Sequence, residues 1–386
     1  MRKKLTLAFA SLLLLVVALP VASCNSGGEI KLGAVMDISG ALSGIGSQIR
    51  DGVQLAVNQI NAAGGIDGKK VKLYVEDGQT DATFGFEAVK KLVEVTGCKV
   101  IIGPMISGAV KAAGDYALQK KILLISPSAT SPEILTQAYR QFVFRTVPSD
   151  ILQGTAMAQL VTEGGYKKVA LLVVNNSYGV GMADVLTKQL AGKATIVAKV
   201  QYDLTKLDYL TELQTIKDKA PDCVIHVGYG DDAKIVYKQA LQLGLSNAQW
   251  IAPEGVYADA TLSVPETAQF MASSVIGTRP TAPEGLAAFT TFAAAYKAAF
   301  SIDPGVYCDN AYDAANLAFA AMKNVGATDG TKIAAEVLKL AKNYAGASGS
   351  ITMDSYGDRV SGDYEVWKVV KSGSTYSYAK VKIIKL

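Results

Sequence analysis

Three hydroxyl-bearing residues follow a short apolar run in the first half of the chain. The run Ile122–Ile125 contains only isoleucine and leucine, which is typical of a buried strand in a parallel sheet. It leads into Ser126, Pro127, Ser128, Ala129 and Thr130, small residues that favour a polar loop. Ligands of open α/β sheets bind beyond the carboxyl ends of the strands. We therefore expect this loop to offer hydrogen-bond donors to a small anionic group.

Residue types used by enzymes and metal sites are scarce. His226 is the sole histidine, and apart from Cys24 the cysteines are Cys98, Cys223 and Cys308, widely spaced and without a CxxC pair. Acid–base catalysis and zinc binding usually draw on more such side chains. We therefore expect no metal, no cofactor and no enzymatic turnover. Three buried free thiols are favoured, and one disulfide is the alternative.

One motif points to another class of protein. Gly228-Tyr-Gly-Asp-Asp-Ala233 follows a predicted strand and matches the dinucleotide fingerprint GxGxx[GA], with Glu254 about twenty residues further on. An NAD-dependent oxidoreductase is therefore the alternative class. It is disfavoured because these glycines lie in the second α/β set rather than the first, and because no catalytic histidine or lysine pattern accompanies them.

The first residues resemble an export signal. Three basic residues at positions 2–4 precede the apolar run Leu5–Leu19, which is short for a membrane span. Val21-Ala-Ser-Cys24 then resembles a bacterial lipobox. We expect residues 1–23 to be a signal peptide, Cys24 to carry a lipid, and residues 24–28 to form a tether; cleavage without lipidation is the alternative. Removing the signal lowers the formal charge from +4 to +1, which gives no electrostatic support for binding nucleic acid.

The rest of the chain alternates predicted strands and helices, as doubly wound α/β folds do. In the first set, the opening strand is predicted at Ile30–Met36. A second strand–helix set begins with the helix Ile151–Glu163 and the strand Lys168–Val174, and it continues with the helix Gly181–Leu190 and the strands Cys223–Val227 and Gln249–Ala252. A strand at Val275–Thr278 is expected to return to the first lobe, and two closing strands, Tyr364–Val370 and Tyr376–Ile384, to cross back to the second. We therefore predict two Rossmann-like lobes, with residues 29–148 and 277–350 in lobe 1 and residues 149–276 and 351–386 in lobe 2.

Short fragments in a consistent order carry a resemblance to a known family. They are Ile30-Lys-Leu-Gly-Ala34, Ala62-Ala-Gly-Gly-Ile-Asp-Gly68, Val100-Ile-Ile-Gly-Pro104, Ile125-Ser-Pro-Ser-Ala-Thr130, Phe144-Arg-Thr146, Tyr178-Gly179, Pro253-Glu-Gly255 and Tyr312-Asp-Ala314. Over nearly the whole mature chain, the sequence resembles the type I periplasmic binding proteins of the Leu/Ile/Val-binding family, the extracytoplasmic receptors of amino-acid ABC transporters. The resemblance implies a three-crossing hinge that closes two lobes on one ligand.

The resemblance also implies the ligand contacts. The matched positions are Ser107, Ser128, Ala129, Thr130, Tyr178, Tyr229, Glu254 and Tyr307. The four from the first lobe would hold a carboxylate, helped by free N–H groups at a helix start. Glu254 would accept the ligand's ammonium as a charge-assisted pair, and the tyrosines would wall the site. Helix capping by Ser128 or Thr130 and ordinary packing of the tyrosines are the alternatives.

The sequence also departs from the family pattern. Ile45 stands where leucine receptors have an aromatic residue, and Thr80 and Ile106 stand where some relatives have a cysteine pair. The implied function is delivery of a small branched-chain or similar aliphatic amino acid to a permease and ATPase in the inner membrane. The expected location is periplasmic or at the cell surface, with a lipid anchor, and a soluble periplasmic protein is the alternative. A sensor subunit, or a receptor for an amide, a urea-like compound or an aromatic acid, is the alternative.

Overall fold

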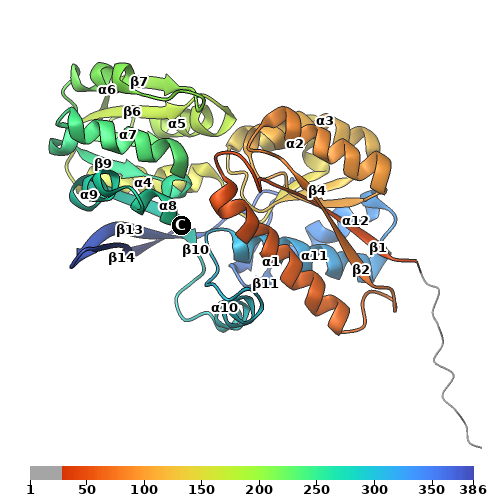
Figure 1. The fold of residues 1–386 in the computed structure, drawn as a ribbon. Helices are drawn as coiled ribbons and strands as arrows, with labels where there is room; N and C mark the ends of the chain where they lie inside the picture. The colour runs from red at the N-terminus through yellow and green to blue at the C-terminus, as the bar shows by residue number, and fades with distance from the viewer. Residues whose placement is uncertain (1–27) are drawn as a thin grey trace, which may run out of the picture.

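Two sheets, each covered by helices on both faces, form two lobes of the molecule (Figure 1). The computed structural model describes residues 28–386, so the predicted signal peptide and the lipid site at Cys24 lie outside the described residues. The predicted α/β fold with two doubly wound lobes is confirmed.

The first lobe is built on five parallel strands in the order β2-β1-β3-β4-β5. Its first segment contains β1 (Ile30–Met36), α1 (Ser43–Ala62), β2 (Val71–Asp77), α2 (Ala82–Lys91), β3 (Val100–Ile102), α3 (Ser107–Lys120), β4 (Leu123–Ser126) and β5 (Val143–Arg145). Strands β3, β4 and β5 are buried along their whole length, because helices cover both faces of the sheet. Helices α2 and α3 pack together on one of these faces.

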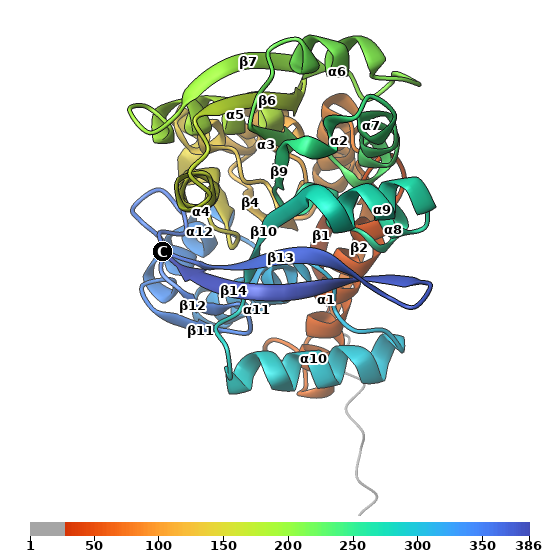
Figure 2. The ribbon, with the colours of Figure 1, turned by 90° about the vertical axis from the view of Figure 1, so that its left-hand side faces the viewer.

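The second lobe is built on seven strands in the order β14-β13-β10-β9-β8-β6-β7. Its first segment contains α4 (Asp150–Glu163), β6 (Lys168–Val174), α5 (Ser177–Gln189), β7 (Thr195–Tyr202), α6 (Leu210–Lys217), β8 (Cys223–Val227), α7 (Gly230–Gln242), β9 (Gln249–Ala252), α8 (Asp259–Leu262), α9 (Pro265–Ser274) and β10 (Val275–Thr281). The chain closes with a hairpin of β13 (Asp363–Ser372) and β14 (Thr375–Lys385). The hairpin joins this sheet antiparallel to β10 and lies below the other strands of the sheet in Figure 2.

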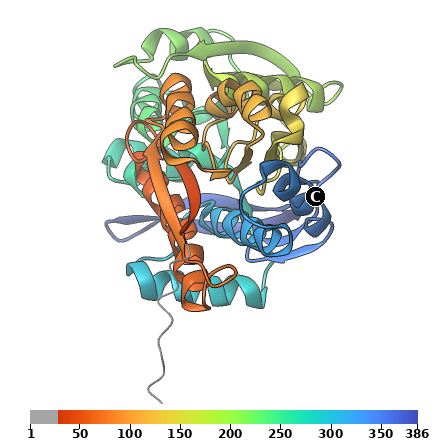
Figure 3. The same cartoon turned by 90° about the vertical axis from the view of Figure 1, so that its right-hand side faces the viewer.

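The first lobe is completed by a segment that follows the second lobe in sequence. This segment contains α10 (Ala287–Phe300), α11 (Cys308–Val325), α12 (Gly330–Leu340), β11 (Tyr344–Gly346) and β12 (Gly349–Ile351). Helix α11 packs along α1 and contacts β3 and β4, and α12 packs on α11 and β4 (Figure 3). The face of the first sheet opposite α2 and α3 is therefore covered by helices from both segments.

The strand expected at Val275–Thr278 differs from the prediction in its partners. It forms β10, which pairs with β9 and β13 in the second sheet as far as Thr281, so it does not return to the first lobe. The apolar residues of β10 predict a strand but do not show which sheet the strand joins. Its partner β13 lies more than 80 residues further along the chain, so no local pattern reveals the pairing. Helix α5 also begins earlier than expected, at Ser177 rather than Gly181, because Asn176 caps it.

The three cysteines of the described chain match the expectation of buried free thiols. Cys98, Cys223 and Cys308 are buried and free in the structure.

Among residues 28–386, none of the helices combines the length and the apolar character needed to cross a bilayer.

Candidate ligand site

The strand order reverses once in each sheet, between β1 and β3 in the first lobe and between β6 and β8 in the second. Loops diverge at such switch points and leave a crevice at the carboxyl ends of the strands. Here the crevices of the two lobes face each other around a cavity of about 30 Å³. The cavity is lined by Leu42, Ile45, Met105, Ile106, Ser107, Ser128, Thr130, Tyr178, Tyr229, Glu254, Gly255 and Tyr307. Seven of the eight predicted site residues are in this set, and Ala129 is not.

The donors of the first lobe come from two loops that are hydrogen-bonded to each other. Ser107 begins α3, and its Oγ accepts a hydrogen bond from Ser131 N at 3.2 Å. The hydroxyl proton has no acceptor among residues 28–386, so it can be donated to a ligand. The Ser128 hydroxyl donates to the carbonyl oxygen of Met105 at 3.0 Å. The buried Ala129 donates its N–H to Ser126 Oγ at 3.0 Å and supports the loop from behind.

Capping does not account for the polar residues of this loop. A 3₁₀ turn, Pro132–Leu135, follows it, and neither Ser128 nor Thr130 caps that turn. Thr130 is almost completely buried and lines the cavity. Ser107 and Thr130 are therefore placed to donate hydrogen bonds to an anionic group.

The second lobe contributes two stacked tyrosines. The rings of Tyr178 and Tyr229 lie 5.8 Å apart at their centroids and are inclined by 15°. Asn176 holds both, because its Oδ1 caps α5 by accepting from Tyr178 N at 3.0 Å and its Nδ2 donates to Tyr229 Oη at 3.0 Å. The Tyr178 hydroxyl is buried and has no hydrogen-bond partner within the described part of the chain. It is therefore available to a ligand.

Glu254 is the one charged side chain among the twelve residues that line the cavity. It follows β9, and only 4% of its surface is exposed. Its Oε1 accepts from the Tyr307 hydroxyl at 2.5 Å, and its Oε2 accepts from Gln153 Nε2. Burial raises the pKa of Glu254, and the hydrogen bonds from Tyr307 and Gln153 oppose this shift. Since a buried carboxylate is costly without a partner, the site favours a ligand that brings a positive charge.

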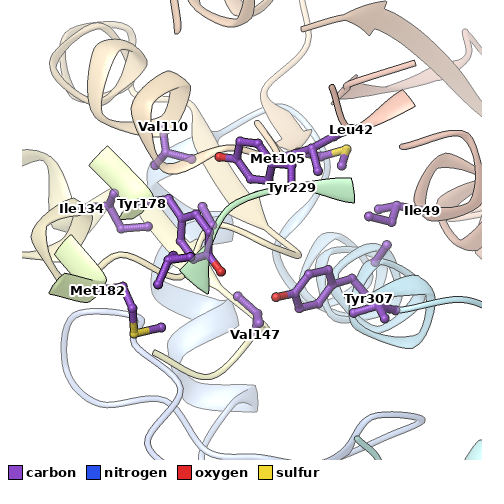
Figure 4. Close-up of a cluster of buried hydrophobic side chains, with 14 of the residues drawn as sticks. Leu42, Ile49, Met105, Val110, Ile134, Val147, Tyr178, Met182, Tyr229 and Tyr307 are labelled. Atoms are coloured by element: carbon purple, nitrogen blue, oxygen red, sulfur yellow. The ribbon is translucent and has the colours of Figure 1, made fainter. Parts of the chain in front are cut away.

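Tyr307 reaches Glu254 from the opposite lobe. It precedes α11 and has a backbone φ of +68°, which is rare for a bulky residue and typical of functional positions. Figure 4 shows Tyr307 on one side of the site and Tyr178 and Tyr229 on the other. The hydrogen bond between Tyr307 and Glu254 thus spans the two lobes.

Aliphatic side chains form the remaining wall. Leu42, Met105 and Ile106 lie in or beside the loops after β1 and β3, and Ile45 lies in the first turn of α1. Ile45 and Ile106 were noted in the sequence as departures from the family pattern, whereas Leu42 and Met105 carry no local signal of function. The topology of the first sheet is what brings them together. This wall suits an apolar ligand group.

A wider hollow of about 690 Å³ adjoins the cavity and shares Ile106, Ser107, Tyr178 and Tyr229 with it. Its other walls come from both lobes, including residues near Thr80 and Asp203. The hollow therefore continues the cleft beyond the inner cavity.

The dinucleotide-like motif has a structural role. Tyr229 N donates to Asp232 Oδ1 at 2.9 Å, so a carboxylate occupies the start of α7, where a pyrophosphate would otherwise bind. Residues 28–386 contain no group of three or more His, Cys, Asp or Glu side chains arranged to hold a metal ion.

Known proteins with this architecture were found by sequence and by structure. The family model described as "Periplasmic binding protein" matches residues 29–374. The Leucine-, isoleucine-, valine-, threonine-, and alanine-binding protein of Pseudomonas aeruginosa is 27% identical over 341 residues, 88% of this chain and 89% of that protein.

Two solved structures show the same fold. The branched-chain amino acid transporter substrate binding protein LivJ of Streptococcus pneumoniae, in complex with isoleucine, has a TM-score of 0.80 and 25% identity, and covers 93% of this chain and 100% of its own. A solute binding protein of Rhodopseudomonas palustris, in complex with 3,4-dihydroxybenzoic acid, has a TM-score of 0.77 and 23% identity over 92% of this chain and 97% of its own. The chain belongs to the type I periplasmic binding proteins, in the family that includes the Leu/Ile/Val-binding proteins.

Proposed function

We propose that the chain binds a small aliphatic α-amino acid between its lobes and delivers it to the permease of an ABC importer. The observation that carries this proposal is the distribution of charge in the cavity. Neutral donors at Ser107 and Thr130 lie in the first lobe, and the single carboxylate of Glu254 lies in the second. An α-amino acid offers a carboxylate to the donors and an ammonium to Glu254, so both of its charges are paired on burial.

The apolar part of such a ligand would meet Leu42, Ile45, Met105 and Ile106. These side chains offer no hydrogen-bonding group except the weakly accepting Met105 thioether. An aliphatic side chain is therefore favoured over one that carries a hydroxyl or an amide. The P. aeruginosa relative, whose name includes leucine, isoleucine and valine, supports the same class of ligand.

An aromatic carboxylic acid is the second candidate, because the R. palustris protein was solved with one. Such a ligand has no ammonium, so its carboxylate would share a buried cavity with Glu254. Two unpaired negative charges in one closed site are unfavourable, and binding would require Glu254 to be protonated. The position of Glu254 therefore favours the amino acid.

Mass spectrometry of small molecules released from the purified, denatured protein tests the proposal. Calorimetry with leucine, isoleucine, valine and benzoate then compares the two ligand classes directly. We expect an aliphatic amino acid to be recovered and rebound. Recovery of a benzoate-like acid, with no binding of any amino acid, would contradict the proposed ligand.

The remaining parts of the proposal concern delivery and location. No activated nucleophile with its base lies in the cavity, so we expect the ligand to be released unchanged after prolonged incubation. We further propose that Cys24 carries a lipid that anchors the protein. If a Cys24→Ser variant were processed and fractionated like the wild type, the anchor would be excluded. Loss of uptake on deleting this chain together with its permease would favour transport over sensing.

A further inference from the structure

Arg145 is a fully buried cation that contacts the loop 126–131 without lining the cavity. Its Nη1 donates to three consecutive carbonyl oxygens, those of Ala129 at 3.2 Å, Thr130 at 2.8 Å and Ser131 at 3.0 Å. Three backbone carbonyls therefore converge on one guanidinium nitrogen.

The direction of these carbonyls fixes the direction of the neighbouring N–H groups. In a trans peptide the C=O of one residue and the N–H of the next point in opposite directions. The carbonyls of Ala129 and Thr130 face Arg145, so the N–H groups of Thr130 and Ser131 face away from it. Ser131 N accordingly donates to Ser107 Oγ at 3.2 Å. The Thr130 N–H has no hydrogen-bond partner among residues 28–386 and is left for a ligand.

The other half of the guanidinium is held by the segment through which the chain crosses from β12 to β13. Arg145 Nε donates to Asp358 Oδ1 at 2.6 Å and Nη2 donates to Asp358 Oδ2 at 2.8 Å, which is a bidentate pair. Arg145 N also donates to the carbonyl oxygen of Gly357 at 3.0 Å. Gly357 has a φ of +82°, and a Cβ there would lie 1.9 Å from the Phe144 ring, so the crossing segment is seated closely on β5.

We propose that Arg145 is a positioning residue for the ligand's carboxylate and that Asp358 holds Arg145 in place. Arg145 turns the carbonyls of the loop 126–131 inward, which presents the Thr130 N–H to the ligand and aligns Ser107 through Ser131. Asp358 balances the charge of Arg145, so the pair contributes orientation rather than net charge. This proposal rests on the proposed function only in needing a ligand with a carboxylate.

The test compares a carboxylate ligand with its amide. Calorimetry measures L-leucine against L-leucinamide, and benzoate against benzamide, on the wild type and on Arg145→Lys. A lysine ammonium cannot bridge Asp358 and three carbonyls with the geometry of a guanidinium. We expect the preference for the carboxylate to fall by about ten- to a hundred-fold, the range of one hydrogen bond to a charged group, with amide affinity changed by less than about three-fold.

The chain offers a matched control. Arg279 forms a similar bidentate pair with Glu365 between β10 and β13, at 3.0 and 3.1 Å, without touching the loop 126–131. Arg279→Lys should leave the carboxylate preference unchanged. A folded Arg145→Lys protein that keeps the wild-type preference would overturn the proposal and leave the proposed function standing.

A measurement on the wild type covers the case in which Arg145→Lys does not fold. In ¹⁵N-labelled protein, the amide resonance of Thr130 should shift on adding L-leucine or benzoate and should shift much less with the corresponding amide. An unmoved Thr130 resonance with a bound carboxylate would overturn the proposal. A wild type that binds benzoate but not leucine contradicts the amino-acid function, and the Arg145 test then proceeds with benzoate. A wild type that binds no carboxylate overturns both.

Discussion

The two halves of the candidate ligand site, one from each lobe, are built in different ways. In the first lobe, the donors belong to loops that hydrogen-bond to one another, as Ser131 to Ser107 and Ser128 to Met105 do. In the second lobe, Glu254 takes one of its two partners, Tyr307, from across the cleft. The half of the site in the first lobe thus has all its hydrogen-bond partners within that lobe. The half in the second lobe gains the Tyr307 hydrogen bond only where the two lobes meet.

We propose that the lobes close on the ligand, and in that case this difference separates two tasks. A preformed set of neutral donors can receive a carboxylate while the cleft is open, at little cost in ordering the protein. The carboxylate of Glu254 can pair with an ammonium in a dry environment only after closure, when that pairing contributes most. The closed state is therefore favoured by a ligand that carries both charges.

The largest expected effect comes from replacing Glu254, the carboxylate of the second-lobe half of the site. Truncating one partner of a buried charge pair costs about 2–5 kcal/mol. Glu254→Ala should therefore weaken amino-acid binding by about thirty-fold to several thousand-fold. Glu254→Gln, which keeps the volume and a hydrogen-bond acceptor, should lose most of the same affinity if charge is the cause. Calorimetry that finds Glu254→Ala within about three-fold of the wild type would remove Glu254 from the site.

The next effect separates two serines within the first half. Ser107 has a free hydroxyl proton, whereas Ser128 donates its proton to Met105 O. Ser107→Ala should weaken binding by about ten- to a hundred-fold, because a hydrogen bond to a charged group is worth about 1.5–3 kcal/mol. Ser128→Ala should stay within about three-fold. Equal losses in calorimetry would contradict the assignment of these donors.

A third test disturbs only the contact between the two lobes, where α5 packs against the loop 126–131. Gly181 of α5 faces the first-lobe loop, and a Cβ there would lie 2.6 Å from Ser131 Oγ and 3.5 Å from Ser131 Cβ. Overpacking typically costs about 1–3 kcal/mol, so Gly181→Ala should weaken binding by about five- to a hundred-fold. Adding Ser131→Ala removes the close oxygen and should restore most of the affinity.

The thermal stability of the unliganded protein distinguishes closure from folding. Alanine is a better helix former than glycine, so Gly181→Ala should not lower the melting temperature of an open protein. Gly154→Ala is the control, because its Cβ would lie 2.4 Å from Val185 Cγ1 inside the second lobe. That variant should lose stability. A melting temperature reduced equally in both would show that Gly181 acts on folding.

The smallest effect concerns pH. Burial raises the pKa of Glu254, and burial together with Glu254 raises that of the neighbouring Asp150. A ligand's ammonium competes with the proton on Glu254, so affinity should fall as the pH falls through its raised pKa, by at most about ten-fold per unit. The sign for folding is opposite, since a carboxyl with a raised folded-state pKa loses stability as pH rises through it. Acid should thus weaken binding before it unfolds the protein, and Glu254→Gln should bind with little dependence on pH.

Strands with continuous apolar runs could be predicted closely from the sequence. Strands β1, β6, β8 and β9 have the predicted bounds, because burial on both faces leaves a mostly apolar run, with Lys31 in β1 and His226 in β8 among the exceptions. The partners of β10 could not be predicted, since pairing with β13 depends on residues far along the chain. Helix starts were harder to predict, as for α5, because a cap such as Asn176 is a single residue and leaves little periodic pattern in the sequence.

Within the site, residues in recognisable loop fragments could be predicted, and those without a local signal could not. Ser107, Thr130 and Glu254 follow buried strands in fragments typical of the family. Leu42 and Met105 have the character of core residues and acquire a place in the cavity only through the order of β1 and β3. Gln153, which holds Glu254, lies inside α4, where a polar residue usually faces solvent.

The order of segments along the chain has a consequence for biosynthesis. Helices α11 and α12 complete the first lobe, yet they follow the whole first segment of the second lobe. Until residues near 340 have emerged, the part of this sheet face that α11 and α12 cover, over β3 and β4, stays exposed and is a target for aggregation or chaperones. The lobe that begins the polypeptide is thus among the last parts able to complete its folding.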